Sequence, residues 1–206
     1  PSHFTENDNL PVENVSWNDV QEFITRINKR TGKDYRLPTV AEWEYAAHGG
    51  IEREIIASSN GIENCYFKYY DFCWNDSNSD GKTHDVGTKK PNELGIYDML
   101  GNVWEWCYDY NSLLGENYKS QKGGAFNSST NNCNFTLTPC CEKNVRCNSF
   151  GFRLAHGVIS ENKAKKYKKL NDKIDLKNAD ELQISTVESL LNRNEYKLII
   201  LNANDV

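Results

Sequence analysis

VSWNDVQEFITRINKRTGKDYRLPTVAEWEYAAHGG, residues 15–50, contains two helix signatures in direct succession. Ser16 lies three residues before Asp19, in a capping-box-like arrangement, and apolar residues then recur at helical spacing. The pattern predicts a helix from about residue 17 to 30. Gly32 is expected to end this helix, because glycine readily adopts the left-handed conformation that terminates helices.

The second signature begins at Thr39, which is suited to cap a helix, with Glu42 three residues later to complete the capping box. The pair Gly49–Gly50 marks the end of this second predicted helix. Its apolar face is formed by Trp43, Ala46 and Ala47. Two short capped helices joined by a tight link are therefore expected.

Strands are predicted further along the chain. VWEWCYDY, residues 103–110, alternates as a strand does, a second strand is expected to start near Lys122, and FGFRLA, residues 150–155, reads as a closing strand. Between the helices and these strands, residues 51–91 show no period and are rich in turn residues. They indicate a long irregular loop, for which Cys65 and Cys73 are candidate disulfide partners.

Composition sets the broad class. The chain has 206 residues, 38% of them hydrophobic, which is enough for one sizeable core. A net charge of -5, with both signs mixed, gives no field for nucleic acid, and no apolar run reaches the roughly 20 residues of a membrane span. Seven cysteines leave at least one thiol unpaired in a monomer.

Domain organisation follows from a change of composition after Ala155. We expect one domain over residues 1–157 and a charged C-terminal appendage over 158–206. In the appendage, a short amphipathic helix is predicted around residues 187–191 and a strand at YKLIIL, residues 196–201.

Four motifs resemble those of formylglycine-generating-enzyme (sulfatase-modifying factor) domains. They are PVENVSW with the two helix signatures, PNELGIYDMLGNVWEW (91–106), KGGAFN (122–127) and FGFRLA, in the same order and similar spacing. The resemblance covers about residues 1–156 and implies an α+β, C-type-lectin-like fold with two helices, small antiparallel sheets and much irregular loop. It also implies several strands ahead of PVENVSW, which this sequence does not include.

The resemblance also locates the family's oxidase site. Its enzymes use two cysteines five residues apart, with copper and oxygen, to convert a substrate cysteine to formylglycine. The first position falls on Ser128 and the second on Cys133. Three further departures, Ala125, Asn134 and Ser149, surround them. Because a hydroxyl cannot replace a thiolate on Cu(I), we expect neither copper nor catalysis, with Cys133 a remnant of the site.

A second branch of the fold, the variable proteins of diversity-generating retroelements, resembles GGAFNSSTNNC followed by FGFRLA. That resemblance implies a non-catalytic protein displaying a diversified surface from residues 124–150 to a protein or other surface ligand. It also implies a cell-surface or extracellular location, for example as a lipoprotein. The expected contact residues are Phe126, Ser128, Thr130, Phe135, Leu137, Cys140, Cys141, Lys143 and Cys147.

Two alternatives stay open: a diverged oxidase in which Cys133 acts with Cys140 or Cys107, and an inert structural module. The run NDSNSDG, residues 75–81, resembles a calcium loop but is better explained as a solvated turn. The family's structural calcium implies a separate candidate set with two carboxylates and two backbone carbonyls. These four residues are Asp98, Gly101, Val103 and Glu105.

Overall fold

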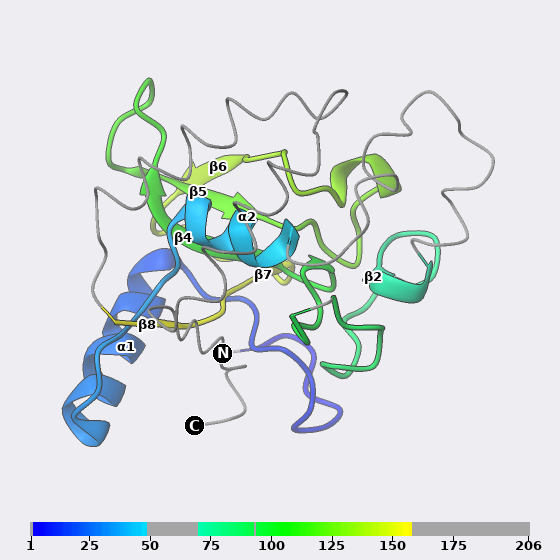
Figure 1. Cartoon of the computed structure of the whole chain (residues 1–206), viewed down its shortest axis with the longest axis horizontal. Coiled ribbons are helices and arrows are strands. Elements are labelled where there is room, and N and C mark those ends of the chain that lie inside the picture. The colour runs from blue at the N-terminus through cyan, green and yellow to red at the C-terminus, as the bar shows by residue number, and fades with distance from the viewer. Residues whose placement is uncertain (1, 49–69, 93, 158–206) are drawn as a thin grey trace, which may run out of the picture.

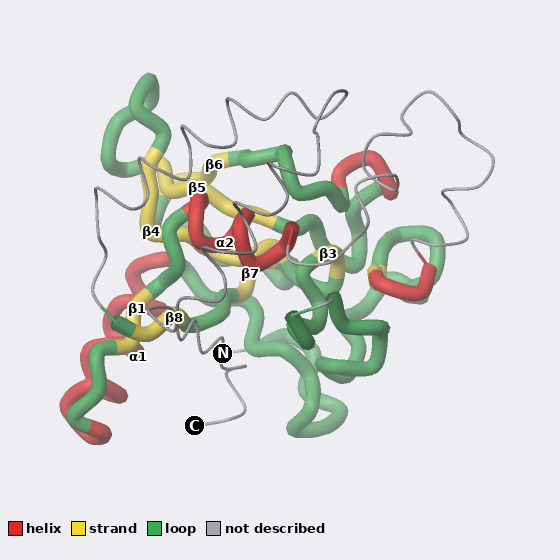
Figure 2. The backbone as a smooth tube through the Cα atoms, viewed as in Figure 1, coloured by secondary structure: helices red, strands yellow, loops and turns green. Residues whose placement is uncertain are grey.

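The computed structural model describes residues 2–48, 70–92 and 94–157 (Figures 1 and 2). Cys65, the end of the second predicted helix at Gly49–Gly50 and the elements predicted in 158–206 lie outside the described residues. Within the described part, no helix is long and apolar enough to cross a membrane. The elements are α1 Trp17–Thr31, β1 Tyr35–Arg36, α2 Val40–His48, β2 Cys73–Trp74, β3 Leu100–Gly101, β4 Trp104–Tyr110, β5 Tyr118–Lys122, the 3-10 turn η1 Thr130–Asn132, β6 Cys140–Glu142, β7 Phe150–Gly151 and β8 Ala155–His156.

Helix α1 confirms the first helix signature. The Ser16 hydroxyl accepts a hydrogen bond from the Asp19 amide at 3.1 Å, and the Asp19 carboxylate accepts one from the Ser16 amide at 2.8 Å. Gly32 follows with φ 67°, the left-handed conformation expected of a C-terminal glycine. The buried face consists of Val20, Ile24 and Ile27.

Helix α2 confirms the second signature. The Thr39 amide donates to Glu42 at 2.9 Å, and the Glu42 amide donates to the Thr39 hydroxyl at 3.2 Å. Arg36 adds a bidentate ion pair to the same carboxylate, at 2.6 and 2.7 Å. The predicted apolar face of Trp43, Ala46 and Ala47 is fully buried.

The central sheet has the strand order β6-β5-β4-β7. Strand β4 confirms the strand predicted at 103–110. The second strand was predicted at the wrong position: β5 ends at Lys122, whereas the strand was expected to start there. The predicted closing strand is divided: β7 pairs parallel with β4, and β8 pairs antiparallel with β1. Position 151 has no room for a side chain, since a Cβ on Gly151 would lie 2.5 Å from the Val12 carbonyl oxygen.

Two apolar clusters cover opposite faces of this sheet, as the alternation along β4 requires. Trp106 points into the α1-side cluster, together with Val15, Val20, Ile24, Ile27, Tyr35, Leu37, Phe152 and Leu154. Its neighbour Cys107 points into the α2-side cluster, together with Trp43, Ala46, Ala47, Cys73, Met99, Leu100, Cys133 and Phe135. Helix α2 lies across β4 and β5 in Figure 1, and contacts both strands. The loops after β5 are therefore anchored on the α2 side.

Residues 75–81 form a turn, as predicted, but the turn is not wholly solvated. The Asn78 and Ser79 amides donate to the Asn75 carbonyl at 3.1 and 3.0 Å. Asn75 and Ser79 themselves are buried. The Ser79 hydroxyl donates to the Phe126 carbonyl at 2.7 Å, so the turn supports the stretch in which the candidate site lies.

Candidate functional site

The position of the family's two active-site cysteines is a compact, closed turn. The Ser128 hydroxyl accepts from the Ala125 amide at 3.0 Å, and the Ser128 amide donates to the Ala125 carbonyl at 2.9 Å. η1 then leads to Cys133, whose side chain is fully buried. The serine therefore serves the backbone of the turn, and the thiol is out of reach of a substrate.

The thiol beside Cys133 is Cys73, which sequence reasoning did not pair with it. The Cys133 side chain lies against the Cys73 thiol in the same apolar cluster, and this contact together with burial raises the pKa of Cys73 far above its ordinary value. Cys107 lies in the same α2-side cluster, whereas Cys140 belongs to β6 and is half-buried. The structure thus adds Cys73, a residue of β2, to the predicted partners of Cys133 and keeps Cys107 in the same cluster.

Three of the nine predicted contact residues are buried, which corrects their assignment to a binding surface. Phe126 packs edge-on against Phe4, with ring centroids 5.4 Å apart, and Phe135 packs against Trp43 at 6.3 Å. The aromatic rings are held by the core, and Ser128 by its turn. Leu137 is exposed, and the half-buried members are Thr130, Cys140, Cys141, Lys143 and Cys147.

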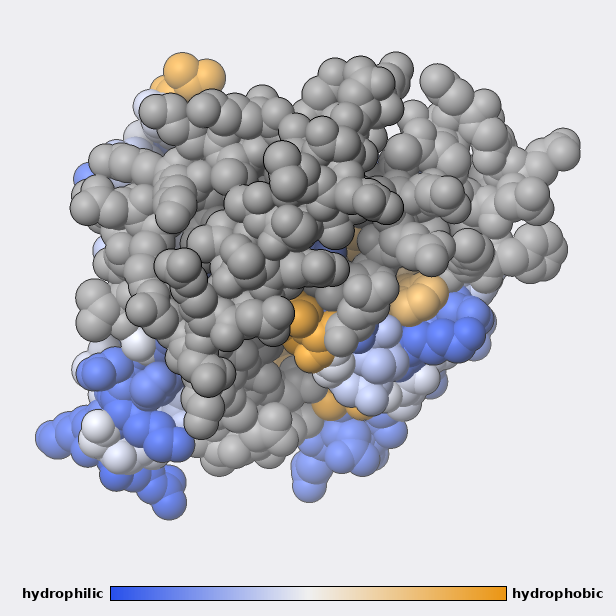
Figure 3. Space-filling view, in the orientation of Figure 1, coloured by the Kyte–Doolittle hydropathy of each residue, from blue (hydrophilic) through white to orange (hydrophobic). Residues whose placement is uncertain are grey.

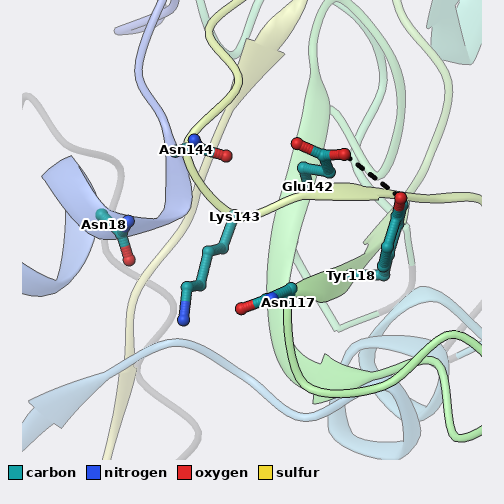
Figure 4. Close-up of a pocket in the computed structure, with 6 residues that line it drawn as sticks. All are labelled: Asn18, Asn117, Tyr118, Glu142, Lys143 and Asn144. Carbon is teal, nitrogen blue, oxygen red and sulfur yellow. Dashed lines mark hydrogen bonds between the residues drawn. The ribbon is translucent and has the colours of Figure 1, made fainter.

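A polar pocket of about 320 Å³ lies where α1, the loop before β5 and the end of β6 meet (Figure 4). The Tyr118 hydroxyl donates to Glu142 at 3.1 Å, and this bond raises the pKa of the phenol. Backbone bonds fix the walls, since the Asn18 amide donates to the Lys143 carbonyl at 3.1 Å and the Lys143 amide to the Asn117 carbonyl at 2.8 Å. The lining residues are Asn18, Asn117, Tyr118, Glu142, Lys143 and Asn144.

Only Lys143 of these six was a predicted contact residue. Glu142 and Asn144 lie inside the predicted 124–150 surface but were not singled out, and Asn117 and Tyr118 lie outside it. The pairing of Tyr118 with Glu142 across β5 and β6 brings the two segments together. No local sequence signal reports that register. The pocket offers amides, a carboxylate, an ammonium and a phenol, which suits a ligand rich in hydrogen-bonding groups.

The four predicted calcium ligands do not fit a cation. Arg153 donates to both oxygens of Glu105, with its Nη2 2.6 Å from Oε1, and Trp43 Nε1 donates to Oε2 at 2.6 Å. A guanidinium thus stands where a cation beside Glu105 would be, and its Nη2 also donates to the Asp98 carbonyl at 3.0 Å. The Gly101 and Val103 carbonyls therefore have no free carboxylate at Glu105 to share a metal with.

Asp98, the remaining carboxylate of that set, accepts from the Gly87 amide at 2.7 Å. Its other oxygen is buried with no hydrogen-bond partner among the described residues, and burial raises the pKa of the carboxyl. Among residues 2–48, 70–92 and 94–157, no three His, Cys, Asp or Glu side chains converge as a metal-binding group.

Comparison with known proteins shows the family of this chain. A family model described as "Sulfatase-modifying factor enzyme 1-like domain" matches residues 1–158. The chain belongs to this family. The α+β, C-type-lectin-like fold class of sulfatase-modifying-factor type is thereby confirmed, although the β2–β3 and β4–β7 pairings are parallel.

Members similar to the chain include both active and inactive proteins. The formylglycine-generating enzyme of Thermomonospora curvata is 39% identical over 116 residues, covering 53% of this chain and 36% of that protein. The inactive C-alpha-formylglycine-generating enzyme 2 of Bos taurus is 28% identical over 159 residues, covering 72% and 51%. The chain thus spans between about a third and a half of these curated relatives.

A solved structure of this family type is also similar. Treponema denticola variable protein 1 superposes with a TM-score of 0.67 at 28% identity, covering 76% of this chain and 77% of that one. The predicted resemblance to variable proteins is therefore supported by the similarity of the two folds as well as by the sequence motifs of this chain.

Proposed function

We propose that this protein is a non-catalytic, receptor-like member of the family that binds a surface ligand through the exposed part of residues 124–150. One observation carries the proposal. The family's catalytic positions are occupied by a backbone-bonded Ser128 and a buried Cys133, while the end of the same stretch lines an open polar pocket. The similarity to a variable protein and to an inactive relative supports the same conclusion.

The proposed contact surface is narrower than residues 124–150 and extends beyond them. Within the stretch it comprises residues 136–148, none of which is buried. Outside it, Asn117 and Tyr118 belong to the β4–β5 hairpin, and a small apolar group projects at the upper left of the space-filling view, where the tip of this hairpin lies (Figure 3). The exposed apolar residues of this hairpin are Tyr108, Tyr110, Leu113 and Leu114. Aromatic side chains beside polar groups are typical of binding surfaces.

The framework around this surface is suited to sequence variation. Residues 136–148 are held by short strand pairing and by backbone bonds such as that from the Val145 amide to the Glu142 carbonyl at 3.0 Å. Exposed positions of this kind tolerate substitution with changes of about 0.5 kcal/mol or less in the free energy of unfolding. A protein could therefore change its ligand here without losing its fold.

Deep sequencing of codons 120–156 in a population of the source organism, with a search of the neighbouring DNA for a near-copy, tests the diversification. We expect substitutions at scattered codons within 136–148 and unchanged codons for the buried Gly124, Phe126 and Phe135. An invariant stretch without a neighbouring copy would remove diversification from the proposal. Equal variation at buried and exposed codons would contradict the assigned surface.

Binding is tested separately by screening labelled protein against arrays of proteins and glycans. The pocket variants Tyr118→Ala and Lys143→Ala are compared with Lys29→Ala, an exposed residue in the last turn of α1. We expect to find a ligand whose affinity falls at least about tenfold in both pocket variants and stays unchanged in Lys29→Ala. A loss of this size corresponds to removal of one hydrogen bond that involves a charged group. A ligand bound equally by all variants would place the site elsewhere.

The second candidate function is a diverged copper-dependent oxidase, favoured by the retention of Cys133 beside another thiol. Incubation with copper and a cysteine-containing sulfatase peptide, followed by detection of aldehyde, distinguishes the two. The binding-protein proposal expects no aldehyde. Aldehyde formation that disappears in Cys133→Ala would establish the oxidase instead.

A cell-surface or extracellular location is part of the proposal. Labelling intact cells with a membrane-impermeant amine reagent would modify exposed lysines such as Lys29 if the protein is displayed. Labelling only after lysis would exclude display.

A further inference from the structure

Two buried sulfur atoms occupy the space left by two glycines. The Gly101 amide donates to the Gly123 carbonyl at 2.9 Å, which brings the β3 turn against the chain after β5. A Cβ on Gly101 would lie 2.7 Å from Cys73 Sγ, and a Cβ on Gly124 would lie 2.6 Å from Cys133 Sγ. Each thiol therefore packs directly against a glycine at the same junction, and at Gly101 the Trp74 carbonyl oxygen, 2.1 Å from the Cβ position, shares that space.

The two cysteines also face each other. Both side chains are fully buried in the α2-side cluster, where the Cys133 side chain contacts the Cys73 thiol. The segments that carry them are held in place without the sulfurs. The Asp76 amide donates to the Ser128 carbonyl at 3.1 Å, and the Asn75 side chain to the Thr130 hydroxyl at 3.3 Å. The pair is thus positioned by the surrounding backbone.

The surroundings favour an uncharged product over a metal complex. The neighbours of the two thiols in the cluster are apolar, including Trp43, Met99 and Phe135. A metal held by two thiolates would place a net charge among these apolar neighbours, which costs free energy unless further polar groups compensate it. A disulfide carries no charge and is compatible with an apolar core.

We propose that Cys73 and Cys133 form a disulfide bond when the chain folds under oxidising conditions. The two S–H bonds are lost and one S–S bond forms, with two protons and two electrons passing to a small-molecule or protein disulfide that is reduced to two thiols. Because both sulfurs are enclosed in the folded protein, the exchange takes place before the core closes.

The bond would join β2 to the start of the stretch that carries the proposed binding surface. It fixes the position of residues 124–135 beneath the exposed residues 136–148, and stands whether or not the proposed function is correct. It also reassigns Cys73, for which sequence reasoning offered Cys65 as a partner. Cys133 accordingly has a structural use in place of the family's chemistry.

Peptide mapping of the full chain tests the proposal. The protein is refolded with a mixture of reduced and oxidised glutathione, its free thiols are alkylated, and it is digested and analysed by mass spectrometry without reduction. We expect a cross-linked peptide pair containing Cys73 and Cys133, lost on reduction. Recovery of both as separately alkylated peptides from folded protein, or of Cys73 linked to Cys65, would overturn the proposal.

Thermal unfolding provides a second readout in case the variants fold poorly. Reduction of the wild-type protein should lower its Tm by roughly 5–15 °C, the range expected for loss of one disulfide in a chain of this size. Cys73→Ala should show no such response to reductant. Cys107→Ala removes a fully buried thiol of the same cluster and should keep the full response. A response shared by wild type and Cys73→Ala would assign it to other cysteines.

Discussion

The stretch from Gly123 to Asn148 divides after Phe135 into two parts with opposite environments. Seven of the thirteen residues from 123 to 135 are buried, whereas none from 136 to 148 is. The first part packs into the α2-side cluster, and the second lies along the edge strand β6 and the pocket. The first part of this polar stretch therefore anchors the chain in the core, and the second part presents a surface.

Loss of a side chain should affect these parts very differently. Phe135→Ala removes a fully enclosed ring that packs against Trp43 and should lower the free energy of unfolding by about 4 kcal/mol. Leu137→Ala, two residues on and 37% exposed, should cost about 1 kcal/mol or less. Urea unfolding of both variants measures the difference. Equal losses in the free energy of unfolding would mean that the boundary between the buried and the exposed part lies at another residue.

Two glycines with nearly equal φ angles make a finer comparison. Gly124, at φ 85°, has no room for a Cβ, which would lie 2.9 Å from the Cys133 Cα, whereas Gly115, at φ 87° in the β4–β5 loop, has open space. Gly124→Ala should cost about 3 kcal/mol from strain and overlap, and Gly115→Ala about 1 kcal/mol from strain alone. Equal losses in the free energy of unfolding of the two variants, measured by chemical denaturation, would show that the residues around Gly124 move to accommodate a Cβ.

The smallest effect concerns the bond that fixes the exposed part to α1. Arg146 makes a bidentate ion pair with Asp19, both contacts at 2.6 Å, and this holds the pKa of Asp19 well below its ordinary value. Because Arg146 is 58% exposed, Arg146→Gln should cost less than about 1 kcal/mol at pH 7. A carboxyl with a lowered folded-state pKa stabilises above its unfolded pKa of about 4, and that contribution is lost as pH falls.

The corresponding measurement is the free energy of unfolding of wild type and Arg146→Gln between pH 7 and pH 2. The difference should shrink steadily below about pH 4. Arg26→Gln serves as a control, since Arg26 and Glu22 form a more exposed pair on the same helix, with side chains 78% and 61% accessible. A difference that stays the same from pH 7 to pH 2 would mean that Arg146 acts through packing rather than charge.

The elements set by neighbouring residues could be predicted from the sequence. Both capping boxes, at Ser16 and Thr39, and the glycine stop at Gly32 depend on contacts within one helical turn, and the structure has all three. The division of residues 150–155 between two sheets could not be predicted, because it depends on pairing with β4 and with β1, both far away along the chain.

The candidate site was predictable only in part, for the same reason. The motifs located the stretch and the lost active-site cysteine at Ser128. Whether Phe126 faces solvent or core depends on Phe4, more than a hundred residues away. The pocket likewise needs the register that sets Tyr118 opposite Glu142. An apolar residue in a polar loop has no local signal that separates an anchor from a contact.

Lys122 bears on how the chain would be cut. Its side chain is fully buried, and the ammonium donates to Glu44, to the Phe135 carbonyl and to Thr138 at 2.8, 2.6 and 3.1 Å. Trypsin cleaves after lysine and arginine but must first draw the side chain into its own pocket. Within the stretch from Lys122 to Asn148, limited digestion of the folded protein should therefore spare Lys122 and cut at the accessible Arg146, so that the anchored part resists trypsin and the displayed part does not.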